Sequence, residues 1–338
     1  MTAISPQTPL EDGAPELAAL REALSRTRAS IATTVIGQQG VVDLMLISLM
    51  AGGHVLLEGP PGVGKTLMVR SLARAAGLTF SRVQFTPDLM PADITGASVL
   101  VPGADGRTQL EFRKGPIFAQ LLLADEINRA TPRTQSALLE AMQEGTVSAG
   151  GTTMDLPKPF FVLATQNPIE MEGTYTLPEA QIDRFLFRID VPYPDQDVLT
   201  GILSATTGTG QDKLTQAMTA SDIIALQGHV RSVPIATAIQ QAVARFCLAT
   251  QPGGETADKD VSRYVRFGVS PRGAQALVVS AKAHAFMADR NHVSVADLRA
   301  VLLPVVRHRV QVNFEGRAAN IDIDKLLLRL FDQTMGKL

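Results

Sequence analysis

One short segment restricts the possible folds of this chain more than any other: GPPGVGKT at positions 59–66. It follows the apolar run His54–Glu58, which predicts a short buried strand, and it precedes a helical pattern from Leu67 to Ala76. A glycine-rich turn with this spacing between a strand and a helix is typical of phosphate-binding loops. Gly62 and Gly64 allow backbone amides to curl around a polyphosphate without a Cβ atom in the way. The segment therefore predicts a parallel α/β sheet with a phosphate site at the end of a strand.

Two side chains of this loop suit a nucleotide and its metal ion. We expect the Lys65 ammonium to reach the β- and γ-phosphates and the Thr66 hydroxyl to bind Mg²⁺. The N-terminus of the following helix adds a partial positive charge at the same place. The alternative, a glycine turn with a surface lysine, is disfavoured by the strand and helix that flank the segment.

A second apolar run, LLLA at 121–124, ends in two carboxylates. Asp125 is expected to hold Mg²⁺ through its water shell, because this ion keeps several waters and takes one or two carboxylates. Glu126 is expected to polarise the attacking water as a general base. An apolar run that ends in Asp-Glu is common by itself, and the phosphate loop upstream favours the catalytic interpretation.

A third polar group, Asn167, follows the apolar run FFVLATQ at 160–166. Ligands of such sheets bind at the carboxyl ends of the strands, so the Asn167 amide is predicted to touch the γ-phosphate or to orient the water. A turn asparagine before proline is the alternative.

Arginines complete the set of candidate catalytic residues. Phosphoryl transfer spreads negative charge over the equatorial oxygens, and a guanidinium matches that geometry. Arg184 follows the asparagine along the chain, and Arg272 opens a later helix in the segment GVSPRG. Arg129 and Arg133, just after the acidic pair, are weaker candidates than these two. Each of these arginines has the alternative of being a solvated surface group.

The chain changes character near Pro194. Before it, short apolar runs alternate with helical stretches, as in a parallel sheet covered on both faces; after it, helical patterns dominate. We predict a flexible tail at 1–14, an α/β nucleotide-binding core at 15–193 and a smaller all-helical lid domain at 194–338.

Two β-hairpins are predicted as insertions in the core. Residues 94–113 form two alternating segments around a GADG turn, and residues 146–157 repeat this arrangement around Gly150-Gly151. The hairpins are either decorative loops or contact surfaces for partners, and the pattern leaves both open.

Composition excludes several classes of protein. Lysine and arginine number 31 against 33 acidic residues, a formal charge of −2, so the basic excess of a chain that binds nucleic acid through its whole surface is missing. A local basic stripe stays open. The single cysteine, Cys247, rules out an internal disulfide and a multi-cysteine metal site, and we expect it to be a small buried residue. The most apolar stretch, Val41–Leu57, is interrupted by Asp43 and a glycine pair, which predicts a soluble cytoplasmic protein without membrane insertion.

These residues together resemble the AAA+ ATPases and, within them, the MoxR family. The strings LATQNPIEMEGTYTLPEAQIDRF at 163–185 and GVSPRG at 268–273 are particularly similar to that family. The resemblance implies that residues 59–66 are the Walker A motif and 121–126 the Walker B motif. It further implies that Asn167 is sensor 1, Arg184 the arginine finger and Arg272 sensor 2.

The resemblance also implies an adenine contact and a clade. The segment at 35–37 resembles the one that contacts adenine, and the hairpin at 94–113 resembles the helix-2 insert of the clade that holds magnesium chelatase ATPase subunits. Gly273 departs from the family pattern, which usually has alanine there. The nucleotide-binding residues implied in this way are Ile36, Gly37, Pro61, Gly62, Val63, Gly64, Lys65, Thr66 and Leu67.

The family resemblance implies Mg²⁺-dependent ATP hydrolysis by a ring, with a hexamer as the expected size, that remodels or matures a protein client. Family members often work with partners that carry von Willebrand A domains. A finger arginine placed after the sheet faces away from its own phosphates, so it is expected to act on a neighbouring subunit's nucleotide. Whether Arg272 acts on its own or on a neighbouring nucleotide stays open, as do the client, the partner and the ring size.

Other functions remain as alternatives. The first is a magnesium-chelatase-type motor subunit, and the second is a nucleotide-gated assembly scaffold in which binding alone closes a ring. Glu126 and Asn167 speak against a scaffold that does not hydrolyse ATP. A nucleic-acid motor is disfavoured by the near-neutral charge. A small-molecule kinase is disfavoured because the sequence shows no recognisable pattern for a second substrate pocket.

Overall fold

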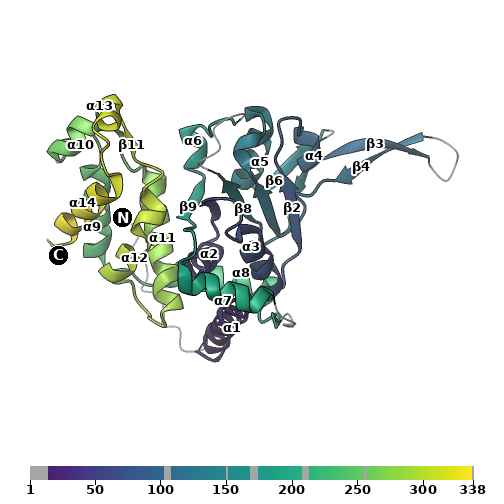
Figure 1. Ribbon diagram of the computed structural model, residues 1–338, viewed down its shortest axis with the longest axis horizontal. Helices are drawn as coiled ribbons and strands as arrows, with labels where there is room; N and C mark the ends of the chain where they lie inside the picture. Colours follow the sequence, from purple (N-terminus) through teal and green to yellow (C-terminus); the bar gives the residue numbers. More distant parts are fainter. Residues whose placement is uncertain are drawn as a thin grey trace, which may run out of the picture.

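The computed structural model describes residues 14–102, 108–149, 151–167, 174–207, 213–254 and 257–336. The described residues build one five-stranded parallel sheet with strands in the order β2-β5-β8-β1-β9 (Figure 1). Its strands are β1 (His54–Glu58), β2 (Phe80–Gln84), β5 (Leu121–Asp125), β8 (Phe161–Gln166) and β9 (Phe185–Asp190). All strands run the same way, so the residues that follow β1, β5 and β8 meet at one edge of the sheet.

Both faces of the sheet are covered, because side chains alternate between two apolar clusters. Leu57, Leu123 and Leu163 belong to the cluster on one face, which contains helices α1 (Ala14–Ala32), α2 (Gln39–Ala51) and α3 (Lys65–Ala75). Leu56 and Leu122 belong to the cluster on the other face, with α4 (Pro91–Thr95) and α5 (Pro132–Glu144). Strands buried on both sides read as continuous apolar runs, which is why the sequence of β5 is LLLA before its aspartate. The predicted α/β core is confirmed.

Helices follow the last sheet strand. They are α7 (Gln196–Thr206), α8 (Ala220–Ser232), α9 (Thr237–Ala249), α10 (Lys259–Tyr264), α11 (Pro271–Met287), α12 (Val295–Val306), α13 (Phe314–Ala318) and α14 (Ile323–Met335). The α11 helix begins where the sequence predicts: the Ser270 hydroxyl accepts the Gly273 amide proton at 3.1 Å and proline occupies the first helical position.

The lid is helical as predicted, with one addition. An antiparallel pair of short strands, β10 (Val265–Phe267) and β11 (Gln311–Val312), joins two parts of the lid that lie far apart in the sequence. Neither strand is long enough to produce an alternating pattern, so the sequence gives no sign of them.

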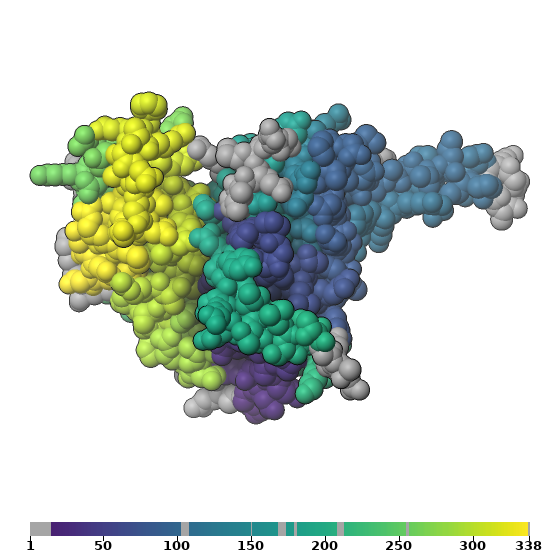
Figure 2. Space-filling view, in the orientation of Figure 1, coloured from purple at the N-terminus to yellow at the C-terminus, as the bar shows by residue number. Residues whose placement is uncertain are grey.

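Both predicted hairpins are present. Strands β3 (Gly96–Pro102) and β4 (Thr108–Lys114) project well beyond the body of the molecule (Figures 1 and 2). Leu100 faces Leu110 across this ladder, and both side chains are exposed. The shorter hairpin consists of β6 (Thr146–Ala149) and β7 (Thr152–Asp155). The tip of the longer hairpin at 103–107, residue 150 of the shorter one and residues 1–13 of the predicted tail at 1–14 lie outside the described residues, while Ala14 begins α1.

Two further expectations from the sequence concern the single cysteine and membrane-spanning segments. Cys247 is buried on α9, where desolvation raises the pKa of its thiol to about 12, so the group is an apolar filler rather than a reactive thiolate. Within the described ranges, no helix combines the length and the apolar character needed to cross a membrane.

Candidate active site

The phosphate loop connects β1 to α3 and contains two glycines in the left-handed conformation. Gly62 has φ +80° and Gly64 has φ +84°, and a Cβ atom on either would meet no described atom within 4 Å. The backbone conformation, and not crowding, therefore explains these glycines, and it leaves open space above the loop. The Lys65 ammonium donates to the carbonyl oxygens of Gly59 at 2.5 Å and Pro60 at 3.2 Å. Burial lowers the pKa of Lys65, and the carboxylates of Asp125 and Glu126 partly oppose this shift.

A cavity of about 400 Å³ opens between this loop and the carboxyl ends of β5 and β8. Nine of the predicted site residues line it, together with one that was not predicted, Thr165. They are Pro61, Gly62, Gly64, Lys65, Thr66, Leu67, Asp125, Glu126 and Asn167. The phosphate loop, the acidic pair and the polar residue after β8 are thus brought together as their positions in the sequence predict.

One hydroxyl group contacts both Asp125 and Glu126. The Thr165 hydroxyl donates to Oδ1 of Asp125 at 2.6 Å and accepts the backbone N–H of Glu126 at 2.8 Å. Glu126 itself has φ +55°, a left-handed conformation that is uncommon for a residue other than glycine. The hydrogen bond to Thr165 helps to hold this turn, and the Glu126 residue so held lines the cavity.

Two side chains of β2 also contact the acidic pair. Arg82 donates to Oδ2 of Asp125 from Nη2 at 2.7 Å and from Nε at 3.1 Å. Gln84 donates to Oε2 of Glu126 at 2.9 Å, and Arg129 contacts the same oxygen at 3.2 Å. Arg82 and Gln84 are two residues apart and so lie on the same side of the strand. Neither residue is predicted from the sequence, because only the pairing of β2 with β5 brings them to these carboxylates.

The donor atoms in the cavity suit the metal ion that the sequence predicts. The Thr66 hydroxyl and the Asp125 carboxylate line the same cavity, and both offer the hard oxygen ligands that Mg²⁺ prefers. The open space above Gly62 and Gly64 suits the phosphates that such an ion accompanies. The residues present therefore fit a magnesium nucleotide.

Three predicted nucleotide-binding residues, Ile36, Gly37 and Val63, are not among the described residues that line this cavity. The Val63 side chain packs against the apolar cluster of α1–α3. Ile36 and Gly37 lie against α7: a Cβ atom on Gly37 would come within 2.3 Å of Val198, and one on Gly201 would lie 3.3 Å from the Ile36 side chain. Gly37 borders a separate hollow with Arg188 and Arg307 rather than the cavity of the phosphate loop.

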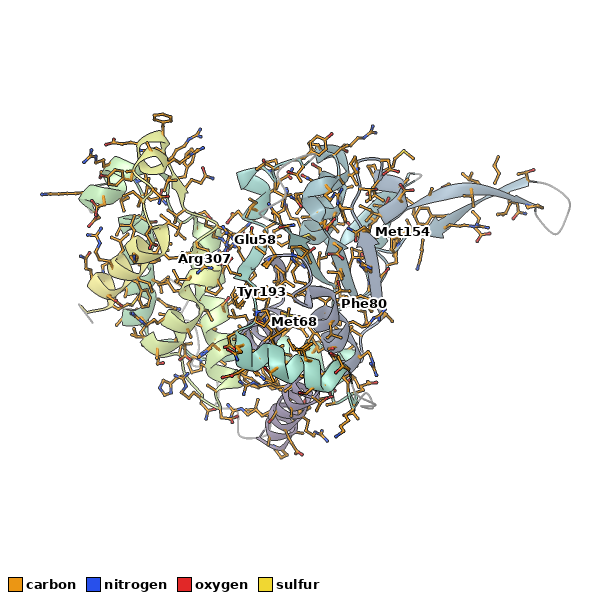
Figure 3. The ribbon with its side chains drawn as sticks, in the orientation of Figure 1. Glu58, Met68, Phe80, Met154, Tyr193 and Arg307 are labelled. Carbon is orange, nitrogen blue, oxygen red and sulfur yellow. The ribbon has the colours of Figure 1, made fainter. Side chains whose placement is uncertain are left out.

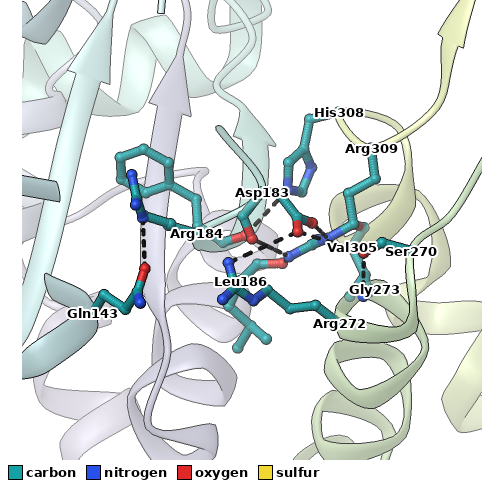
Figure 4. A network of polar contacts seen from close by, with 11 residues as sticks. Gln143, Asp183, Arg184, Leu186, Ser270, Arg272, Gly273, Val305, His308 and Arg309 are labelled. Atoms are coloured by element: carbon teal, nitrogen blue, oxygen red, sulfur yellow. Dashed lines mark hydrogen bonds and ion pairs between the residues drawn. The ribbon is translucent and has the colours of Figure 1, made fainter. Parts of the chain in front are cut away.

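The two predicted catalytic arginines share a different cavity. Arg184 and Arg272 both line a hollow of about 790 Å³ between the sheet and the lid, and neither is among the described residues that line the phosphate-loop cavity. Arg184 donates from Nε to Oε1 of Gln143 at 3.0 Å, and Arg272 approaches Oδ2 of Asp183 at 3.9 Å (Figure 4). The structure therefore brings the two arginines close to one another and separates them from the phosphate loop of their own chain. We call the hollow of about 790 Å³ that contains Arg184 and Arg272 the sheet–lid groove.

Comparison with known proteins agrees with these features. Residues 54–187 match the family described as "ATPase family associated with various cellular activities (AAA)", and residues 257–326 match "AAA lid domain". The first match spans the sheet and the second the later lid helices, so each part of the fold is recognised separately.

Whole-length relatives are more specific. The chain is 42% identical to "Chaperone MoxR1" of Mycobacterium tuberculosis over 94% of its own length and 83% of that protein. It is 33% identical to "Protein MoxR" of Methylorubrum extorquens, over 92% of this chain and 94% of the relative. A crystal structure of a "putative ATPase" from Cytophaga hutchinsonii superimposes with a TM-score of 0.89 at 35% identity, covering 95% of this chain and 97% of the other. With the fold, the phosphate loop and the lid in agreement, this chain belongs to the MoxR family of AAA+ ATPases.

Proposed function

We propose that this chain hydrolyses ATP to ADP and phosphate with Mg²⁺ and uses the reaction to remodel or mature a protein client. The observation that carries the proposal is the single cavity that holds Lys65, Asp125, Glu126 and Asn167 at the carboxyl edge of the sheet. Phosphoryl transfer to water requires a cation that binds the phosphates, a metal ligand, a base and an amide that orients the water, and all four surround this cavity.

Each residue has a distinct part in the proposed reaction. Lys65 binds the phosphates, while Glu126 accepts a proton from the water that attacks the γ-phosphorus. Asn167 orients that water or the γ-phosphate. Thr66 and Asp125 hold Mg²⁺, which when bound shields the negative charge of the phosphates. The hydrogen bonds from Thr165 and Gln84 keep the two carboxylates in place without reorganisation at the moment of reaction.

The arginines are proposed to act between subunits. Arg184 and Arg272 line the sheet–lid groove and not their own phosphate-loop cavity, so a neighbouring subunit must bring its nucleotide to them. We therefore propose that both act in trans, in a closed ring whose expected size is a hexamer. A guanidinium supplied by a neighbour stabilises the charge of the transition state and couples hydrolysis to contact between subunits.

The name of the mycobacterial relative supports a chaperone role. We propose a cytoplasmic chaperone-like motor, with a von Willebrand A domain protein as a partner, whose ring changes shape as nucleotide is hydrolysed.

Glu126→Gln tests the hydrolysis. We expect turnover to fall by about 10²- to 10⁴-fold, because the general base is lost while the size of the side chain is kept. Phosphate release measures turnover, and calorimetry with ATP and Mg²⁺ measures binding, which should persist. Glu140→Gln, an exposed change on α5, is the matched control. Unchanged turnover in Glu126→Gln contradicts the proposal, and the same variant held with ATP provides a bait for capturing the client.

A further inference from the structure

Three consecutive residues after α12 attach the lid to strand β9. Arg307 forms an ion pair with Asp190 at the end of the strand, and the imidazole Nε2 of His308 lies 3.1 Å from the carbonyl oxygen of Phe185. Arg307 lies at the junction of lid and sheet, close to Glu58 at the end of β1 (Figure 3). Arg309 reaches the beginning of the strand. We call residues 307–309 the lid clamp.

Arg309 is the most deeply buried member of the lid clamp, with a side chain only 2% exposed. Its Nε donates to Oδ1 of Asp183 at 2.8 Å, and Nη2 donates to the carbonyl oxygens of Asp183 at 3.2 Å and Phe185 at 2.7 Å. Its Nη1 donates to the carbonyl oxygens of Leu186, at 3.1 Å, and Val305. These contacts use all five N–H groups of the guanidinium and fix the backbone on both sides of Arg184 (Figure 4).

The same arginine touches the beginning of α11, where Arg272 lies. A Cβ atom on Gly273 would lie 2.8 Å from Cδ of Arg309 and 2.6 Å from a methyl group of Val269. The side chains of Val269 and Arg309 together therefore occupy the space that an alanine at position 273 would need. This contact gives a physical reason for glycine at a position where the family pattern usually has alanine.

Asp183 links Arg309 to Arg272 and to the start of α11. Its carboxylate pairs with Arg309, approaches Arg272 at 3.9 Å and lies 3.4 Å from the Ser270 hydroxyl that caps α11. A buried guanidinium needs such a counter-charge, and here one carboxylate serves both the buried arginine and the exposed one.

We propose that Arg309 is a positioning residue that holds Arg184 and Arg272 in one fixed arrangement across the sheet–lid groove. Arg309 contacts the backbone around the first arginine and the helix start that carries the second, and it is not among the described residues that line the phosphate-loop cavity. This role rests on the proposed function, in which both arginines act on a neighbouring nucleotide.

Two variants test the role from opposite sides. Arg309→Lys keeps the charge but loses the forked donor pattern, and Gly273→Ala keeps Arg309 but crowds it, together with Val269. In both we expect kcat for ATP hydrolysis to fall by about 10- to 100-fold while ATP affinity is kept, because a displacement of about 1 Å of catalytic groups has that effect. The matched controls are Arg299→Lys, in an exposed ion pair on α12, and Gly228→Ala on α8, where a Cβ atom would meet no described atom within 4 Å.

Mixing subunits separates positioning from a general structural defect. Either variant is mixed with Glu126→Gln, which lacks the base but supplies intact arginines to its neighbour. We expect turnover to recover well above that of either protein alone, because the variant's own phosphate-loop cavity is complete. Failure of mixing to restore turnover overturns the positioning role.

Arg184→Ala in the same assays distinguishes a failure of the proposed finger action from a failure of the positioning role of Arg309. Full turnover in Arg184→Ala contradicts the proposed action of the finger and, with it, the role of Arg309. Loss of turnover in Arg184→Ala combined with normal kcat in Arg309→Lys and Gly273→Ala overturns the role of Arg309 alone. Thermal unfolding checks that each variant is folded, and if Arg309→Lys is not, Gly273→Ala decides.

Discussion

The phosphate-loop cavity and the sheet–lid groove differ in what holds their charged side chains. In the cavity, Asp125 and Glu126 are held by residues of the sheet and its loops, chiefly Arg82, Gln84 and Thr165. In the groove, the segment that carries Arg184 and the start of α11 are held by Arg309 of the lid. The sheet alone can therefore build the cavity, whereas the groove requires the lid to be docked.

This difference predicts that a change in the phosphate-loop cavity weakens ATP binding, whereas a change in the sheet–lid groove lowers turnover and leaves ATP binding nearly intact. Lys65→Ala should weaken ATP binding by about 100-fold, because it removes a charge-assisted contact to the phosphates. Arg184→Ala should leave affinity within about two-fold while turnover falls by about 10³-fold, the usual contribution of a finger arginine. Calorimetry and phosphate release measure the two quantities. Equal loss of affinity in both variants would break the distinction between cavity and groove.

A smaller effect concerns stability, because two histidines are shielded from water: His54 at the start of β1, which lines the sheet–lid groove, and His308 of the lid clamp. In the sheet, His54 accepts the Val162 N–H at 3.1 Å and donates to the Met142 carbonyl oxygen at 3.1 Å, and burial lowers its pKa from 6.5 to about 4. In the lid clamp, burial and neighbouring arginines lower the pKa of His308 well below its ordinary value. As pH falls below about 6.5, the unfolded chain binds protons that the folded chain does not, so stability declines toward pH 4.

For His54 the shift corresponds to about 3 kcal/mol of the free energy of unfolding. Denaturant unfolding between pH 7 and pH 4 measures this decline. His54→Gln and His308→Gln should each make it shallower, and a slope that neither variant changes would contradict the buried neutral state of these rings.

The smallest expected effect concerns metal affinity in the cavity. Arg82 occupies one oxygen of Asp125, so Arg82→Ala should lower the Mg²⁺ concentration needed for half-maximal nucleotide binding by a few fold, roughly the effect of one partly exposed charge. A magnesium titration of fluorescent nucleotide binding measures it, with Arg82→Lys as the control that keeps the charge. A higher magnesium requirement in Arg82→Ala would indicate that Arg82 orients Asp125 rather than competing for it.

Local pattern predicted the cavity well. The phosphate loop, Asp125, Glu126 and Asn167 each follow an apolar strand, and parallel strands necessarily bring their carboxyl ends to one edge. Thr165 could have been found by the same reasoning, because it lies near the end of β8, two residues before Asn167.

Contacts that depend on sheet order or on domain docking could not be predicted in this way. Arg82 lies 43 positions from Asp125, and Arg309 lies 126 positions from Asp183. A short sequence motif cannot reveal a contact between residues that lie so far apart in the chain. The glycine at position 273 was visible in the sequence as a departure from the family pattern, but its contact with Arg309, in the turn after α12, depends on the tertiary structure.

One apolar cluster runs without a break from the α2 side of the sheet into the lid. Leu46 of α2, Leu226 of α8 and Leu277 of α11 are all fully buried in it. Pulling the lid off the sheet would expose such side chains at about 1.5–3 kcal/mol each. The protomer is therefore expected to transmit torque as a rigid body, so that movement in a ring arises by tilting whole subunits against one another and not by swinging the lid open.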